Sequence, residues 1–234
     1  MKKILGALIL CVLALPLAAF NIPQGQQNSY YEPLLDLFST GVNSGLAAAT
    51  IPAKIFSAGF QANIAINTGG EILSQAGNTD NYFFPLLYVN LHISDFLIFG
   101  RGFAMKQHEV STWYAGGGLG YIVSDYKLFF PQIRILGAFH ILNSGSDDFK
   151  VSTATVNAVA DYKIPILPIH ALANIAYERN MMSTSWTDFR NVDFGVNRVR
   201  FSLGAMVSIL FLNVSYEYTI LPNPNHNLGL SVGF

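Results

Sequence analysis

The chain has 234 residues, of which 51% are hydrophobic and only 12% are charged, and its formal net charge is −1. An average soluble domain has about twice that charged fraction. A chain with so little charge has to hide apolar surface in a large core or in lipid, and without a basic excess it offers no favourable face to nucleic acid.

The first 19 residues have the anatomy of a cleaved secretory signal. Two lysines precede an apolar run from Ile4 to Leu17, and two alanines follow it. The run is short for a retained membrane anchor, which is the alternative, and the polar segment 21–29 follows almost at once. We therefore expect residues 1–19 to be a signal peptide. Cys11, the only cysteine, lies inside it, so the exported chain is expected to have neither a disulfide nor a thiolate metal site.

Residues 20–51 separate this leader from the first run of alternating residues. Three apolar side chains in the segment recur at helical spacing: Leu34, Leu35 and Phe38. Pro33 suits the first position of a helix, because its fixed φ fits and its missing N–H would have no partner there anyway. The pattern predicts a short helix over about residues 31–40. The segment could cap the structure that follows it or enter it.

From residue 52 to the end, apolar and polar residues alternate with the period of two that is typical of strands. The run 55–67, for example, puts apolar side chains on one face and Ser, Gln and Asn on the other. Outside the leader no run of about 20 apolar residues could make a spanning helix, so contact with lipid has to come from alternating strands. Turn signals divide the region into ten strands, an even number that brings both ends of a barrel to one side of a membrane.

The connections between these strands also differ on the two sides of the predicted barrel. One side has the connections 69–81, 107–111, 143–148, 180–193 and 221–225, and the other has 94–95, 124–127, 163–166 and 209–211. Bacterial barrels have short periplasmic turns and longer external loops, so we expect the first set outside. The sequence therefore predicts an all-β fold, a transmembrane antiparallel up-and-down β-barrel of about ten strands over residues 52–234, with a short N-terminal helix.

One predicted strand, residues 96–106, does not show which face meets lipid. Arg101 has the same parity as four large apolar side chains: Leu97, Phe99, Phe103 and Met105. Either a bulge changes the facing within this strand, or the lumen contains an apolar patch.

Three glycines suggest room for the N-terminal segment in the lumen. Gly116, Gly118 and Gly120 leave the inner face of their strand bare. We expect the helix of residues 31–40 to use this room and to dock in or under the periplasmic mouth. Its expected contacts are Leu34, Leu35 and Phe38 with the barrel wall, and Glu32 or Asp36 with an inward arginine such as Arg134.

The chain ends on an alternating strand with an aromatic last residue. Four positions resemble the insertion signal of bacterial outer-membrane barrels: Asn227, Gly229, Val232 and Phe234. This resemblance implies a location in the cell outer membrane, with lipid and the barrel-assembly machinery as partners. The exported chain is also similar in architecture to a family of small outer-membrane barrels of uncharacterised function that have a Pro-Leu-Leu helix before the first strand. No functional residue follows from that similarity.

Charged and polar side chains of both signs are predicted to line the lumen. The set is Arg134, His140, Asp161, Glu178, Arg198, Arg200 and Glu217. One interpretation is that ion pairs and hydrogen bonds fill a narrow barrel. The other is a selectivity surface for a small polar solute, because fixed charges in a pore select what passes.

Catalysis is not expected from this set. His140, Thr153 and Glu178 have the residue types of a base, a nucleophile and an orienting acid, but a threonine is a rare nucleophile in such a site. The histidines are scattered without ligand spacing, so no metal site is proposed, and no motif indicates a cofactor. The protein is therefore not expected to be an enzyme.

Two functions remain. The first is a porin-like barrel that passes or binds a small solute or an apolar ligand, with the N-terminal segment limiting the lumen. The alternative is a structural or interaction barrel that presents external loops to a partner and transports nothing. For the barrel wall itself, alternation predicts that Ile135, Phe201 and Val207 face lipid, so that arginine should be far more costly at these positions than at Ser202.

Overall fold

The computed structural model describes residues 27–51, 55–66, 82–107, 110–127, 130–144, 149–184 and 192–234. The predicted leader lies outside these residues. Neither helix in the described part of the chain is long and apolar enough to cross a membrane.

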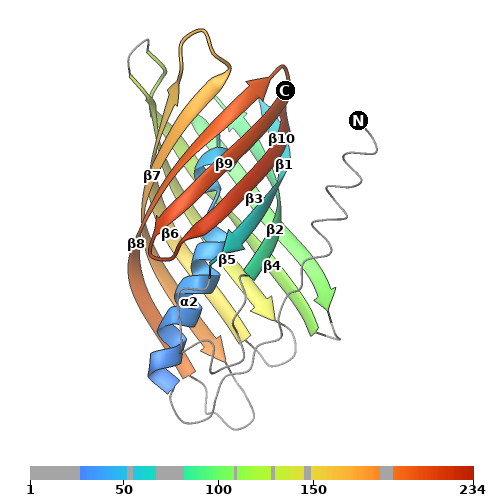
Figure 1. The fold of residues 1–234 in the computed structure, drawn as a ribbon, viewed down its shortest axis with the longest axis vertical. Helices are drawn as coiled ribbons and strands as arrows, with labels where there is room; N and C mark the ends of the chain where they lie inside the picture. The colour runs from blue at the N-terminus through green and yellow to red at the C-terminus, as the bar shows by residue number, and fades with distance from the viewer. Residues whose placement is uncertain are drawn as a thin grey trace.

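Ten antiparallel strands form one closed barrel (Figure 1). In chain order they are β1 (Phe56–Ala65), β2 (Tyr82–Ile93), β3 (Phe96–Gln107), β4 (Val110–Ser124), β5 (Gln132–Ser144), β6 (Phe149–Lys163), β7 (Ile169–Thr184), β8 (Val192–Ile209), β9 (Leu212–Leu221) and β10 (Asn225–Gly233). Each strand pairs with its neighbours in the chain, and β1 pairs with β10 to close the ring. The predicted fold class, an all-β up-and-down barrel of ten strands with an N-terminal helix, is confirmed.

The two ends of the barrel are built differently, and we name them by their connections. The turn end has the connections 94–95, 125–131, 164–168 and 210–211, and the loop end has 66–81, 108–109, 145–148, 185–191 and 222–224. Both termini of the barrel meet at the turn end, where the Ile55 N–H donates to the Phe234 carbonyl oxygen at 2.8 Å.

Two predicted loops at the loop end are shorter than expected. Much of 107–111 and of 180–193 belongs to the β3–β4 and β7–β8 hairpins. The reason is that the alternation continues there: the side chain of Met181 is exposed and that of Met182 is buried in the lumen.

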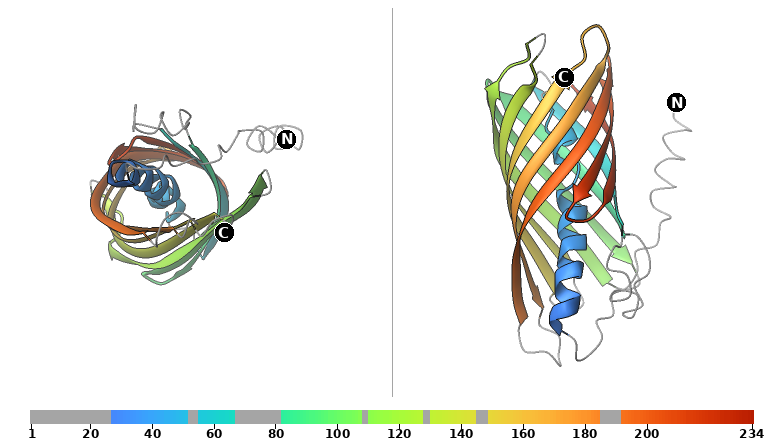
Figure 2. Two further views of the ribbon diagram at one scale, coloured as in Figure 1. Left: turned by 90° about the horizontal axis from the view of Figure 1, so that it is seen from below. Right: turned by 60° about the vertical axis from the view of Figure 1, so that its left-hand side comes forward.

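The lumen contains two helices, α2 (Gln27–Asn43) and α3 (Leu46–Ala49), which run from the loop end towards the turn end (Figures 1 and 2). The predicted helix over 31–40 was too short, and Pro33 lies inside α2 instead of at its start. Ser, Thr and Gly at positions 39–41 would weaken an exposed helix, but the barrel wall supplies hydrogen-bond partners and tight packing there. We refer to residues 27–51 as the plug segment.

The outer face of the barrel is a continuous apolar surface. Large exposed hydrophobic side chains occur on all ten strands, with Leu87, Leu119, Ile175, Leu203 and Leu228 among them. A soluble monomer rarely exposes such a large apolar area, whereas a bilayer requires it. The alternation predicted from the sequence therefore separates an apolar outer face from a lumen face.

The first testable prediction concerns a charged side chain introduced on this outer face. Ile175 lies in the middle of β7, is 53% exposed and is paired with Ala158 and Phe201. Ile175→Arg is expected to destabilise the barrel in lipid by about 2–4 kcal/mol, because the guanidinium would lie near the bilayer centre. Leu167→Arg, in a connection at the turn end, is the matched control and should cost no more than about 1 kcal/mol. Urea titration of barrels refolded in lipid vesicles measures both, and equal costs would contradict the proposed lipid belt.

The expected cost of arginine at other positions depends on their depth in the bilayer and on whether they face lipid or the lumen. Ile135 and Val207 are exposed on the outer face but lie close to the turn end, so their costs should be lower than in the middle of the bilayer. Arginine was also expected to cost much less at Ser202 than at these lipid-facing positions, and the plug segment removes the reason for that expectation. Ser202 is fully buried under the plug segment and donates to Glu217 Oε1 at 2.7 Å.

The ambiguity in β3 is explained by an apolar patch in the lumen. Leu97, Phe99 and Arg101 all point inward and are buried, and β3 pairs with β4 without a bulge. An inner apolar cluster forms around α3: Leu46, Ala47, Leu97, Phe99, Leu136, Ala138 and Val159. Apolar side chains are tolerated on this lumen face because α3 covers them.

Candidate functional site

The candidate site is the interface between the plug segment and the lumen wall. On one side, α2 places apolar residues in an outer cluster near the loop end. Its buried members are Leu35, Leu37, Phe38, Val42, Ala65, Phe84, Leu86, Tyr114, Leu142, Val151 and Met182. The rings of Phe38 and Phe84 meet edge to face at 5.8 Å, and Gly41 lies so close to Phe84 that a β-carbon would not fit. Leu35 and Phe38 thus lie against the barrel wall, while the side chain of Leu34 is outside the described residues.

Near the amino end of α2, Arg198 of β8 binds two carboxylates. Its Nε donates to Asp36 Oδ1 at 2.9 Å and Oδ2 at 3.1 Å, and its Nη2 donates to Glu32. We name these three residues the outer clamp. The side chain of Glu32 is 50% exposed and that of Arg198 is 22% exposed, so the clamp is open to solvent on one side. An ion pair as exposed as that of Glu32 is weak, typically about 0.2–1 kcal/mol, whereas the side chain of Asp36 is only 13% exposed.

The carboxyl-terminal part of the plug segment is held in another way, through its backbone carbonyls. The last turns of a helix leave carbonyl oxygens without helical partners and carry partial negative charge. Barrel side chains donate to these oxygens: Asn63 to Gly41 at 2.6 Å, Tyr114 to Val42 at 3.1 Å, Arg101 to Ser44 at 2.7 Å, Gln61 to Gly45 at 2.7 Å, Asn90 to Ala49, and Arg134 to Thr50. This end is therefore fixed by buried donors from five strands.

These contacts correct two expectations about the helix. It does not dock only in or under the mouth at the turn end, because α2 and α3 extend along the lumen. Arg134 is not the partner of Glu32 or Asp36; it lies at Thr50, and Arg198 takes the two carboxylates. The partner was misplaced because the height of the helix in the barrel cannot be derived from its sequence.

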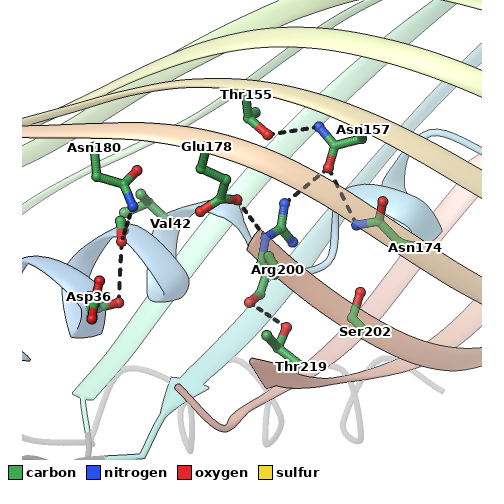
Figure 3. Close-up of polar contacts among 12 residues, drawn as sticks. Asp36, Val42, Thr155, Asn157, Asn174, Glu178, Asn180, Arg200, Ser202 and Thr219 are labelled. Atoms are coloured by element: carbon green, nitrogen blue, oxygen red, sulfur yellow. Dashed lines mark hydrogen bonds and ion pairs between the residues drawn. The ribbon is translucent and has the colours of Figure 1, made fainter. Parts of the chain in front are cut away.

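A buried polar network lies on the wall formed by β6, β7 and β8 (Figure 3). Arg200 Nε donates to Glu178 Oε1 at 2.6 Å, and its Nη2 donates to Asn157 Oδ1 at 3.1 Å. Asn157 also contacts Thr155 at 3.1 Å and Asn174 at 3.4 Å. Arg200, Glu178 and Asn157 are fully buried. Two residues after Glu178 on β7, Asn180 donates to Ser39 Oγ of the plug segment at 3.0 Å.

Near the turn end, two carboxylates face the end of the plug segment. Glu217 accepts hydrogen bonds from Ser202 Oγ at 2.7 Å and from the Ala48 N–H at 3.3 Å. Asp161 lies 2.9 Å from His170 Nδ1 and 3.9 Å from Arg134 Nη2, and it accepts a hydrogen bond from Tyr126. Burial and the Asp161 carboxylate raise the pKa of the Tyr126 phenol, so this turn residue stays protonated and remains a donor.

All seven predicted lumen residues point inward, and six of them are buried. His140, Arg134, Asp161, Glu178, Arg200 and Glu217 are at most 1% exposed, and Arg198 lies in the more open clamp. The structure does not bring His140, Thr153 and Glu178 into a hydrogen-bonded chain. Within the described residues, both ring nitrogens of His140 and the hydroxyl of Thr153 have no hydrogen-bond partner, and Glu178 is bound by Arg200. In the described residues, no three His, Cys, Asp or Glu side chains gather as metal ligands.

The bare glycine face does not receive the helix, contrary to expectation. Side chains of neighbouring strands already fill it: His140 lies over Gly116, Phe99 over Gly118, and Leu136 over Gly120. Gly118 is next to the inner cluster around α3, whereas Leu35 belongs to the outer cluster, so the helix residues expected there lie at another height.

Glycine is needed at another place, between the two helices. Gly45 has a φ of 76° and lies against the side chain of Asn227. Asn227 in turn donates to Asn63 across the β1–β10 seam. Of the other predicted insertion-signal residues, Gly229 lies against Ser215, Val232 is half-buried, and Phe234 is exposed and stacks on Phe211 at 6.3 Å. Their role as a signal stays a prediction.

The donors that hold the plug carbonyls were missed by sequence reasoning. Gln61 and Asn63 belong to the polar face of the run 55–67, but inward amides also occur in water-filled barrels. Tyr114 was not singled out at all. No sequence signal distinguishes an amide that binds water from one that binds a helix end.

No protein-family model matches the sequence, and no curated protein matches it either. Among solved structures, outer-membrane barrels are similar. The N-terminal β-barrel domain of Pseudomonas aeruginosa OprF aligns over 76% of this chain and 97% of its own, with 11% identity and a TM-score of 0.38. Neisserial surface protein A aligns over 79% and 100%, with 12% identity and a TM-score of 0.38. The Ralstonia pickettii toluene transporter TbuX aligns over 80% and 72%, with 10% identity and a TM-score of 0.29. Similarities this low transfer neither a function nor a ligand.

Proposed function

We propose that this protein is a barrel of the bacterial outer membrane that is closed at rest by its plug segment and lets a small polar solute pass when part of that segment moves. The apolar outer face supports the location, because it matches a bilayer. The predicted signal peptide and insertion signal would bring the chain there with the help of the barrel-assembly machinery.

The observation that carries the proposal is the polarity of the plugged lumen. Arg101, Arg134, Arg200, Asp161, Glu178 and Glu217 are buried in it. Buried charges add little stability compared with well-packed apolar side chains, so a lumen that never opens would not need them. A lumen that water and solutes enter does need a polar wall.

Unpartnered polar atoms in the same region add support. In the part of the chain that the structure describes, both amide atoms of Asn43, both ring nitrogens of His140 and the Nη1 of Arg200 are buried without a hydrogen-bond partner. Native interiors leave few such atoms unpaired, because each costs about 1–3 kcal/mol. An open, hydrated lumen would satisfy them, which lowers the free-energy difference between the closed and open states.

The two halves of the plug segment differ in how firmly they are held. Residues 27–39 depend on the partly exposed outer clamp, the Asn180–Ser39 hydrogen bond and the outer apolar cluster. Residues 41–51 are fixed by buried donors, two of them arginines. We therefore assign the movement to residues 27–39, with the remainder staying bound to the wall.

The outer clamp offers the test. Arg198→Ala removes both ion pairs, of which only the one with Glu32 involves a half-exposed side chain, and it is expected to make channel openings about three to ten times more frequent in planar bilayers. Arg179→Ala is the matched control, since Arg179 lies on the outer face at the same end and donates to Asn197 Oδ1 at 3.2 Å rather than to the plug segment. It should leave the openings unchanged.

The alternative, a structural barrel that transports nothing, is favoured by the buried donors around residues 41–51. If neither the unmodified protein nor Arg198→Ala opens at any voltage, while both are folded by their mobility in unheated gels, this alternative replaces the proposal.

A further inference from the structure

The plug segment runs through the barrel in one direction, and this determines on which side of the membrane each of its ends lies. At the amino end of α2, Glu32 and Asp36 bind Arg198, which lies in the first half of β8, close to the connection 185–191 at the loop end. At the other end of the segment, Ala49 and Thr50 bind Asn90 and Arg134, which lie close to the turn end. Figure 2 shows the same course, with α2 entering at the end opposite to the carboxyl terminus.

The turn end has the features of a periplasmic end. Both termini of the barrel lie there, and even-stranded bacterial barrels keep both in the periplasm. Two of its four connections, 94–95 and 210–211, have only two residues, whereas the loop end has the connection 66–81 and the long β7–β8 hairpin. A group of exposed aromatic side chains also surrounds the turn end, as at a membrane interface: Phe56, Phe96, Tyr121, Phe130, Phe211 and Phe234.

We propose that the amino end of the plug segment, with the outer clamp, faces the cell exterior, so that the clamp is accessible from outside. The segment then crosses the membrane once inside its own barrel, and its two ends lie on opposite sides. This inference rests on the outer-membrane location proposed above, but it does not require the plug to move.

This orientation determines from which side of the membrane a molecule can reach residues 27–39. Glu32 is half-exposed at the external mouth, while the periplasmic end of the lumen is occupied by residues 46–51, which are buried. An agent in the periplasm would meet the firmly held half first. A solute arriving from outside would meet the clamp first.

Single cysteines test the orientation in living cells, because Cys11 is the only native cysteine and is replaced by alanine in every variant. Glu32→Cys reports on the plug. Lys150→Cys, exposed at the start of β6, reports on the loop end, and Leu210→Cys, 93% exposed in the β8–β9 connection, reports on the turn end. A charged maleimide that does not cross the outer membrane is added to intact cells and to cells with a permeabilised outer membrane, and folding is checked by mobility in unheated gels.

The expected result is labelling of Glu32→Cys and Lys150→Cys in intact cells, with Leu210→Cys labelled only after permeabilisation. Labelling of Lys150→Cys without Glu32→Cys would overturn the plug direction. Labelling of Leu210→Cys without Lys150→Cys would overturn the barrel orientation. Absence of folded protein from the outer-membrane fraction would instead contradict the proposed location, so the two failures can be told apart.

Discussion

Gly118→Val is expected to destabilise the barrel by about 3 kcal/mol or more, one of the largest effects of any single substitution in the wall. A β-carbon at Gly118 would overlap the Gly137 carbonyl oxygen and lie 2.7 Å from the Phe99 ring and 2.9 Å from the Ala138 α-carbon. Overpacking usually costs about 1–3 kcal/mol, and more where backbone atoms have to move, because they cannot rotate away like a side chain. The shift would also disturb the cover that Phe99 provides for α3.

Gly137→Val is the matched control, since Gly137 lies on the neighbouring strand and faces outward. No atom of the described residues lies within 4 Å of the position that its β-carbon would take. The same change should alter stability by less than about 1 kcal/mol, because valine suits both a strand and a lipid face. Urea titration of barrels in detergent micelles, followed by mobility in unheated gels, compares the two. Equal losses would show that the facing of β4 and β5 is not as described.

The strands could be predicted because alternate residues of each run face two different surroundings, lipid and the lumen. Leu87, Val89 and Leu91 had to face lipid, and Tyr88 and Asn90 had to face the lumen, whatever the lumen contains. In β3 this reasoning did not show which face meets lipid, because Leu97 and Phe99 are apolar although they lie on the lumen face. They could be placed only once α3 was seen to cover them.

The helix itself was harder to predict. Its apolar spacing indicated Leu35 and Phe38, but its length depends on wall residues that lie far away in the sequence. Thr40 and Gly41 would weaken a free helix, and they are helical in this protein because the lumen encloses them.

The lumen side chains were identified as a set, but not their partners. Arg198 and Arg200 are two residues apart on the same face of β8, yet one binds the plug and the other binds Glu178 of β7. Which arginine meets which carboxylate depends on the stagger between strands and on the height of the helix. Neither the stagger nor the height can be derived from the local pattern of residues.

Two engineered disulfides, one in each half of the plug segment, can show which half moves when the lumen opens. Ser39→Cys with Asn180→Cys would pin residues 27–39 to β7, because Ser39 Oγ and Asn180 Nδ2 are 3.0 Å apart. Ser44→Cys with Thr219→Cys would pin the other half to β9, because the two hydroxyl oxygens are 2.9 Å apart. Non-reducing gels verify that each disulfide has formed before recording, because Asn180 Nδ2 lies one bond further from its β-carbon than a cysteine sulfur would.

Planar-bilayer recordings of these two variants, oxidised and then reduced, test most directly whether residues 27–39 close the lumen. The outer disulfide, 39 to 180, is predicted to abolish openings until a reductant restores them. The inner disulfide, 44 to 219, is predicted to leave openings unchanged, because that half stays in place when the lumen opens. Openings that persist with the outer disulfide formed would contradict the account.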